Sequence, residues 1–92
     1  MEKITFYVGR KDKNMDKTVL SKSDVIKVFE KFFDGGTFYN GNGFYKGSFE
    51  PTVVFEALNF SGKTGEELKE IKEELEEELG QEEILVTVAD LS

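Results

Sequence analysis

Apolar and polar residues alternate in the first ordered segment of the chain, KITFYVG at residues 3–9. Ile4, Phe6 and Val8 point to one side, as is typical of a strand with one face in a core. The charged stretch 10–20 has no clear period, and we expect it to form a loop.

Two later segments repeat their apolar residues at helical spacing. The first begins at Ser21, whose S-K-S-D context fits a helix N-cap, and Gly35-Gly36 is a natural signal for its end. The second begins with a capping box, TGEE at residues 64–67, and ends at Gly80. Its single apolar stripe consists of Leu68, Ile71, Leu75 and Leu79.

Three further strands are predicted, at residues 37–46, 52–58 and 83–89. Gly41 and Gly43 interrupt the first of these around Asn42, which favours an edge bulge with a tight Asn-Gly turn. The second, TVVFEAL, is almost continuously apolar, as expected of a central strand.

The resulting order, β-α-β-β-α-β, predicts an α+β, ferredoxin-like fold in a single domain over residues 1–92. We expect one four-stranded antiparallel sheet with both helices on one face, the first and third strands central and the others at the edges. The second face of the sheet then has no helix over it. Tyr7 is expected there, with one or two of Tyr39, Tyr45 and Val54, as a ligand platform or an oligomer interface.

The chain of 92 residues has no cysteine and no histidine. These absences exclude disulfides, thiolate metal sites and Ser-His-Asp or Cys-His catalysis, although carboxylate-only chemistry stays open. We therefore expect a protein that is not an enzyme and has no metal and no cofactor. No apolar run is long enough to span a membrane and no signal peptide opens the chain, so a cytoplasmic location is expected.

The net charge of −7 is unevenly distributed. Residues 1–31 carry a net charge of +3, whereas residues 32–92 carry −10, with ten acids between Glu66 and Glu83. This charge disfavours direct contact with nucleic acids and acidic membranes, and it favours a basic protein surface. An alternative function follows, in which the Glu-rich second helix blocks a nucleic-acid-binding surface, as an acidic phage-type inhibitor would. The partner-binding candidates are Tyr7, Glu70, Glu73 and Glu77. A solvated helix face explains the same acids.

The stretch GGTFYNGNGFYKGSFEP, residues 35–51, holds five of the nine glycines and five of the twelve aromatic residues. With the cations near the end of the first strand, it predicts a site for a small anionic ligand, whose charge would meet backbone amides and cationic side chains. The ligand-binding candidates are Arg10, Lys11, Tyr39, Asn42, Tyr45, Lys46 and Glu50. The preferred function is a non-enzymatic binding or regulatory module, assembled as a homo-oligomer, that takes a small ligand or a protein partner here.

Two other features of the strands have competing interpretations. Glu56 lies inside the apolar third strand, and it is expected either to face the open side of the sheet or to pair with a cation across an interface. KGSFEPTVVF has some features of an RNA-recognition signature, but Ser48 stands where that signature has an aromatic or small apolar residue.

The order of these short motifs, "YVG", "GGTFYNGNGFYKG", "EPTVVFEAL" and "GQEEILVTV", resembles an uncharacterised bacterial and phage family. The resemblance spans nearly the whole chain, and its positions here are Gly9, Gly36, Thr37, Gly43, Tyr45, Glu50, Gln81 and Glu82. More remotely, the chain is similar to PII-type ferredoxin folds, which form trimers and bind nucleotides or other small ligands between subunits. This resemblance implies a fold and an assembly but no activity.

Overall fold

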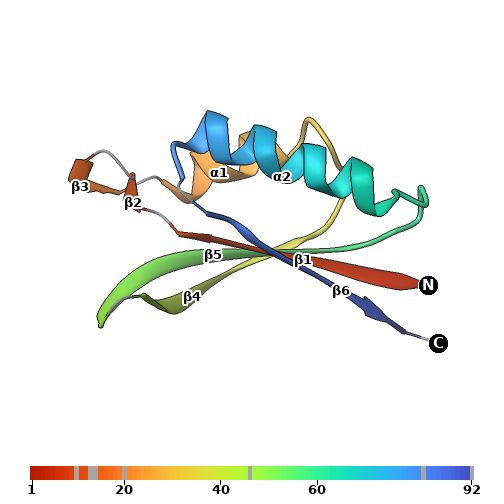
Figure 1. Ribbon diagram of the computed structural model, residues 1–92, viewed down its shortest axis with the longest axis horizontal. Coiled ribbons are helices and arrows are strands. Elements are labelled where there is room, and N and C mark those ends of the chain that lie inside the picture. Colours follow the sequence, from red (N-terminus) through yellow and green to blue (C-terminus); the bar gives the residue numbers. More distant parts are fainter. Residues whose placement is uncertain (10, 13–14, 20, 46, 82, 92) are drawn as a thin grey trace.

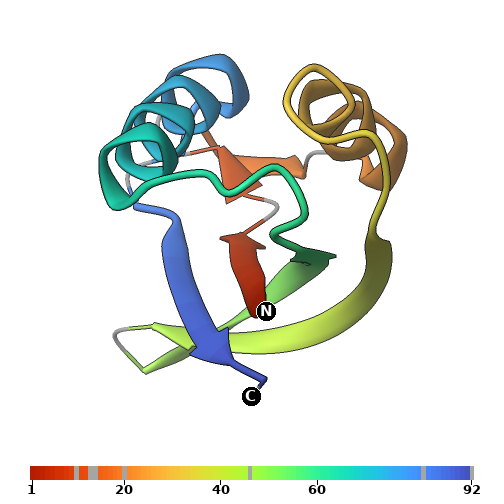
Figure 2. The ribbon, with the colours of Figure 1, turned by 90° about the vertical axis from the view of Figure 1, so that its right-hand side faces the viewer.

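The computed structural model describes residues 1–9, 11–12, 15–19, 21–45, 47–81 and 83–91. A four-stranded antiparallel sheet in the order β4-β5-β1-β6 carries two helices on one face (Figures 1 and 2). The strands are β1 (Glu2–Gly9), β4 (Thr37–Tyr45), β5 (Ser48–Leu58) and β6 (Leu85–Asp90), and the helices are α1 (Lys22–Phe29) and α2 (Gly65–Leu79). The predicted ferredoxin-like fold is confirmed, including central positions for β1 and β5.

An aromatic cluster fills the core between the sheet and α1. Phe6 of β1, Phe29 of α1 and Phe55 of β5 are buried, with ring centroids 5.2 Å apart for Phe6–Phe29 and 4.5 Å apart for Phe29–Phe55. Burying each such ring contributes about 1.5–3 kcal/mol. The alternation seen in β1 arises because its even-numbered residues face this cluster.

Helix α2 follows the sequence prediction closely. The hydroxyl of Thr64 accepts a hydrogen bond from the Glu67 amide at 3.2 Å, and the Glu67 carboxylate accepts one from the Thr64 amide at 3.3 Å. Gly80 ends the helix in the left-handed conformation, at φ 62°. The predicted apolar stripe is the buried side of the helix.

Helix α1 is shorter than predicted. Its N-cap is Ser21, whose hydroxyl accepts a hydrogen bond from the Asp24 amide, but the helix ends at Phe29 instead of continuing to Gly35-Gly36. Beyond it the amide of Phe32 bonds to the carbonyl of Phe29 at 3.0 Å, which tightens the chain into a turn. This turn brings Phe33 against Phe6, and core packing therefore ends the helix before the glycines do.

The predicted bulge and Asn-Gly turn in the second strand are wrong. Strand β4 pairs with β5 without a break from Thr37 opposite Glu56 to Tyr45 opposite Ser48. Neither Gly41 nor Gly43 has a positive φ, and both adopt the extended conformation of the strand. The reversal lies next to Gly47, at φ 79°, and β5 consequently begins several residues earlier than the predicted residue 52.

The stretch predicted as a loop contains a small hairpin, β2 (Lys11–Asp12) and β3 (Met15–Val19). Backbone hydrogen bonds hold such a pair, so no apolar periodicity marks it in the sequence. The last strand is slightly displaced from its predicted bounds of 83–89. Across the described residues, none of the helices is both long enough and apolar enough to cross a membrane.

Candidate functional site

One face of the sheet is turned away from the helices (Figure 2) and is here called the open face. Its central row of side chains is apolar and aromatic. Strand register aligns Tyr39 with Val54, Val54 with Tyr7, and Tyr7 with Leu85. Val54 is only 5% exposed although no helix covers it, because a tyrosine flanks it on each side. The predicted exposure of Tyr7 and Tyr39 on this face is confirmed, and Val54 shares the face with them.

A polar row runs beside the apolar one. The Glu56 carboxylate lies 3.4 Å from Lys3 Nζ on the neighbouring strand β1. Partial burial, and then the charge of Glu56 and its hydrogen bond with the tyrosine hydroxyl, raise the pKa of Tyr39. Glu56 therefore faces the open side of the sheet, as preferred from the sequence, and it organises Lys3 and Tyr39 around one carboxylate.

The far end of the open face, here called the glycine end, is formed by Gly9, Gly43, Glu50 and Gln81. A side-chain carbon placed on Gly9 would overlap the Glu50 carboxylate and would lie 3.2 Å from Gln81 Oε1. A carbon placed on Gly43 would lie 2.6 Å from Thr52 Oγ1 and 3.3 Å from the backbone oxygen of Glu50. Gly9 thus makes room for the half-buried Glu50 carboxylate beside the buried Gln81, and Gly43 makes room for the Thr52 hydroxyl.

Four positions of the family resemblance meet at this end, although they are far apart in the sequence. Gly9 and Gln81 were not among the predicted site residues, and only Glu50 was. A buried glutamine directly after a helix-ending glycine is the one local signal that could have drawn attention to Gln81.

The predicted ligand site is only partly assembled. Tyr39 and Glu50 both belong to the open face, but Gly43, the partner of Glu50, is four positions beyond Tyr39 on β4, which separates them by about 13 Å. Strand alternation places the exposed Asn42 on the opposite side of β4.

Two of the remaining candidates for ligand binding lie in strands, and two lie outside the described residues. Lys11 lies in β2, and Tyr45 lies in β4 opposite Ser48. Arg10 and Lys46, like Glu82 of the family resemblance, lie outside the described residues.

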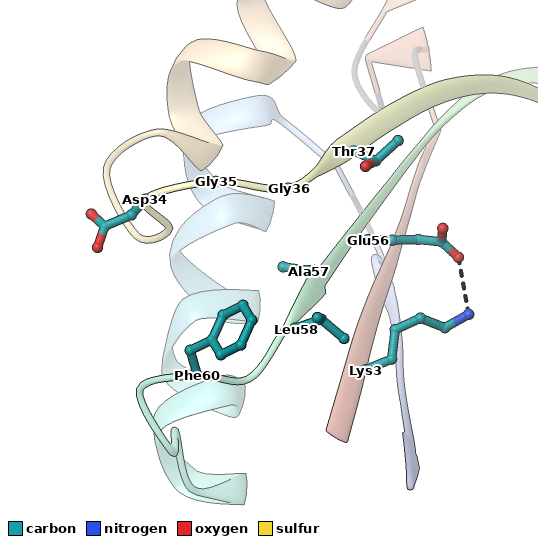
Figure 3. Close-up of a pocket in the computed structure, with 9 residues that line it drawn as sticks. All are labelled: Lys3, Asp34, Gly35, Gly36, Thr37, Glu56, Ala57, Leu58 and Phe60. Carbon is teal, nitrogen blue, oxygen red and sulfur yellow. Dashed lines mark ion pairs between the residues drawn. The ribbon is translucent and has the colours of Figure 1, made fainter. Parts of the chain in front are cut away.

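A pocket of about 600 Å³ lies at the other end of the open face, near the start of β1 (Figure 3). Gly36, Ala57 and Phe60 give it an apolar wall, and the Lys3–Glu56 ion pair stands beside them. Lys3 and Gly9 are six positions apart on β1, so about 20 Å separates the pocket from the glycine end. The sequence did not predict this pocket. Residues 34–36, just before β4, line it once Thr37, the first residue of β4, has paired with Glu56 of β5.

The outer side of α2 carries the predicted partner-binding acids. Glu70, Glu73 and Glu77 are exposed, and within the described part of the chain none of them has an ion pair.

The lysines near α2 bind other acids on its flanks. Lys72 lies 2.7 Å from Glu76 and 3.3 Å from Glu83, and Lys31 pairs with Glu78. The hydrogen bond to Glu76 raises the pKa of Lys72. No group of three metal-ligating side chains converges among the described residues.

Two solved structures share this fold over nearly the whole chain. One is a phage SAM lyase in complex with S-methyl-5′-thioadenosine, with a TM-score of 0.75 and 20% sequence identity, over 97% of this chain and 80% of that chain. The other is a phage SAM lyase in the apo state, with a TM-score of 0.70 and 20% identity, over 96% of this chain and 78% of that chain. At this identity the likeness shows the ferredoxin-like fold.

No protein-family model matches the chain, and a comparison with curated proteins gives no match. The resemblance to the uncharacterised bacterial and phage family and to PII-type folds therefore stays a prediction, supported at the level of fold by the phage structures.

Proposed function

We propose that this chain binds an S-adenosyl compound, S-adenosylmethionine (SAM) or its thioether product, at the glycine end of the open face. The observation that carries the proposal is the Glu50 carboxylate, half-buried over the bare backbone of Gly9. The chain also shares its fold with a phage SAM lyase whose structure contains S-methyl-5′-thioadenosine.

The chemistry of SAM suits this end of the sheet. Its sulfonium and ammonium groups are positive, and a partly buried carboxylate attracts positive charge more strongly than an exposed one. Tyr7 lies two residues from Gly9 on the same face, about 7 Å along β1, where its ring can stack on adenine.

This proposal changes the charge expected of the ligand. The sequence predicted an anionic ligand from Arg10, Lys11 and Lys46, whereas the described residues of the glycine end present an acid. SAM is compatible with both, because it carries a negative carboxylate as well as the positive sulfonium that would face Glu50.

The test is calorimetric titration of the purified protein with SAM and, separately, with S-methyl-5′-thioadenosine, which lacks the positive charge. Glu50→Gln keeps the shape of the side chain and is expected to weaken SAM binding roughly 10- to 100-fold, with a much smaller effect on the thioether. Glu30→Gln, which removes the same charge from the exposed end of α1, is the matched control. Equal affinity of the wild type and Glu50→Gln for SAM would refute the site.

The same samples decide whether binding includes catalysis. Breaking the bond between sulfur and the four-carbon amino acid moiety of SAM transfers the bonding electrons to sulfur and releases S-methyl-5′-thioadenosine. In a lyase step the four-carbon moiety either closes to a lactone, as its own carboxylate attacks the carbon that leaves sulfur, or loses a proton from the neighbouring carbon and forms an alkene. Appearance of this thioether by chromatography would make the chain a lyase. Binding without release would make it the non-enzymatic binding module predicted from the sequence.

A second candidate function, the acidic inhibitor, is favoured by the exposed carboxylates on the outer side of α2. Glu70, Glu73 and Glu77 are three and then four residues apart, so they present negative charge along one side of the helix. The triple substitution to lysine should abolish inhibition of a target whose nucleic-acid-binding surface is basic. Full inhibition by the triple variant would exclude this function.

A further inference from the structure

Strand β4 is an edge strand without the usual protection against pairing with another chain. Edge strands are normally short, bulged, or blocked by charge or proline. Strand β4 has nine residues, pairs with β5 without a bulge, and contains neither charge nor proline. Charged residues make up 34% of the chain, so a charge-free edge of this length is unusual for this protein.

The sequence of β4 is also similar in both directions. Around Gly41, the order FYN-G-NGF places Asn40 and Asn42 at equal distances, and Phe38 and Phe44 at equal distances. In an antiparallel pair of identical strands with Gly41 at the centre, each residue of such a set lies opposite its counterpart. The strand is therefore complementary to itself.

We propose that β4 is the interface for a second copy of this chain, paired antiparallel about a two-fold axis at Gly41. The two sheets join into one of eight strands, with both pairs of helices on the same side. Asn40 of each copy lies opposite Asn42 of the other, where their amides can hydrogen-bond. Phe38 lies opposite Phe44, and Tyr39 lies opposite Gly43.

This pairing covers side chains and backbone that the free strand leaves exposed. Phe44 is 70% exposed and touches only Phe49 among aromatic residues of the described chain, with ring centroids 5.9 Å apart. In the pair, Phe38 of the second copy lies opposite it, and cross-strand aromatic pairs of this kind stabilise sheets. On the open face, the Tyr39 ring covers the backbone of Gly43, which has no side chain of its own.

This assembly does not depend on the ligand proposal. The two-fold axis is perpendicular to the sheet, so the open faces of both copies point the same way and stay accessible at Gly9 and Tyr7, and the pair covers the glycine end only at Gly43. A different edge pairing, β4 with β6 of the next copy, would build a ring or a fibre instead. Only the β4–β4 pair places the two copies of residue 41 opposite each other, so the position of cross-links distinguishes the two assemblies.

Engineered cysteines test the register directly, because the chain has none of its own. Gly41→Cys is tolerated in the fold, since a carbon at this position has only Val54 Cγ2 nearby, at 3.7 Å. In the proposed pair, the two copies of residue 41 have Cα atoms about 4.5–5.5 Å apart, which is within disulfide range. Mild oxidation should therefore give a covalent dimer. Asn40→Cys is the matched control, because its two copies are about 8 Å apart and should stay uncrosslinked.

Charges at the exposed positions 40 and 42 test the same register without oxidation. Asn40→Lys/Asn42→Lys places lysines opposite each other twice, and it should raise the dimer dissociation constant roughly 2- to 30-fold in analytical ultracentrifugation. Asn40→Lys/Asn42→Glu places opposite charges there and should restore or tighten the dimer. A wild type that remains a monomer at high concentration, an uncrosslinked Gly41→Cys variant, or equal weakening by both charge variants would overturn the proposal.

Discussion

Gly9→Ala places a methyl group where the Glu50 carboxylate now lies. The carboxyl carbon is 2.6 Å from the position of the new carbon, so it must retreat to at least 3.4 Å for an ordinary contact. The nearby Gln81 Oε1, at 3.2 Å, must give way by a few tenths of an ångström. The substitution therefore displaces the one carboxylate on which the ligand proposal rests.

The effect on folding is expected to be small. Gly9 has no positive φ, and the clash involves the far end of a flexible side chain and no backbone atom. The reduced freedom of the unfolded chain contributes about 0.4–1 kcal/mol in favour of alanine and offsets part of the clash. We expect the free energy of unfolding, measured by urea denaturation, to change by less than about 1 kcal/mol.

The effect on binding is expected to be large. Binding sites hold their polar groups to within about 0.5 Å, so this displacement should weaken SAM binding by roughly tenfold or more in calorimetry. Gly35→Ala is the control, because a carbon there meets nothing within 4 Å, and it should change neither quantity. Unchanged SAM affinity in Gly9→Ala would contradict the proposed site, and a loss of several kcal/mol of stability would contradict the packing argument.

Three further substitutions have expected outcomes. Gly36→Ala drives a carbon into the buried Phe55 ring and to 2.7 Å from a backbone oxygen, so it should cost about 1–3 kcal/mol in urea denaturation; a neutral result would show that the core can shift there. Leu75→Ala removes a fully buried side chain of α2 and should cost about 2–5 kcal/mol by the same measurement, with a loss below about 1 kcal/mol contradicting its burial. Glu56→Gln should lower the pKa of Tyr39. That pKa is measured by titrating tyrosinate absorbance and subtracting the titration of the same protein with Tyr39→Phe. Since that pKa is raised in the folded state, the stability linked to it is present below pH 10.0 and lost as the pH rises through the folded value; an unmoved pKa would exclude Glu56 as a cause.

The elements could be predicted from the sequence wherever burial imposes a period. The stripe of α2 and the alternation of β1 specify which side faces the core, and with the chain order they define the ferredoxin-like fold. The β2–β3 hairpin and the early end of α1 could not be predicted in this way. Backbone hydrogen bonds determine the first, and the fit of Phe33 among the core rings determines the second.

The glycine end could be predicted only in part, for a related reason. Glu50 could be chosen as an acid beside a proline in an aromatic stretch, but its position over Gly9 depends on the register between β1 and β5. That register pairs Gly9 with Thr52, whereas Gly9 and Glu50 are 41 positions apart in the chain. No local pattern contains this information. The pocket near Lys3 could not be predicted either, because three segments enclose it only after the sheet has formed.

The two proposed functions use opposite layers of the molecule, so they can be separated experimentally. The buried stripe of α2 faces the sheet, which leaves its acidic side pointing away from the open face (Figure 2). The triple lysine variant of Glu70, Glu73 and Glu77 therefore leaves the side chains of the glycine end unchanged. Because position 77 lies only four residues before Gln81, SAM binding is measured at high salt, which screens the added charge. SAM binding that survives this variant but fails in Glu50→Gln would assign the ligand to the sheet. Loss of inhibition in the triple variant alone would show that the helix layer has a function of its own.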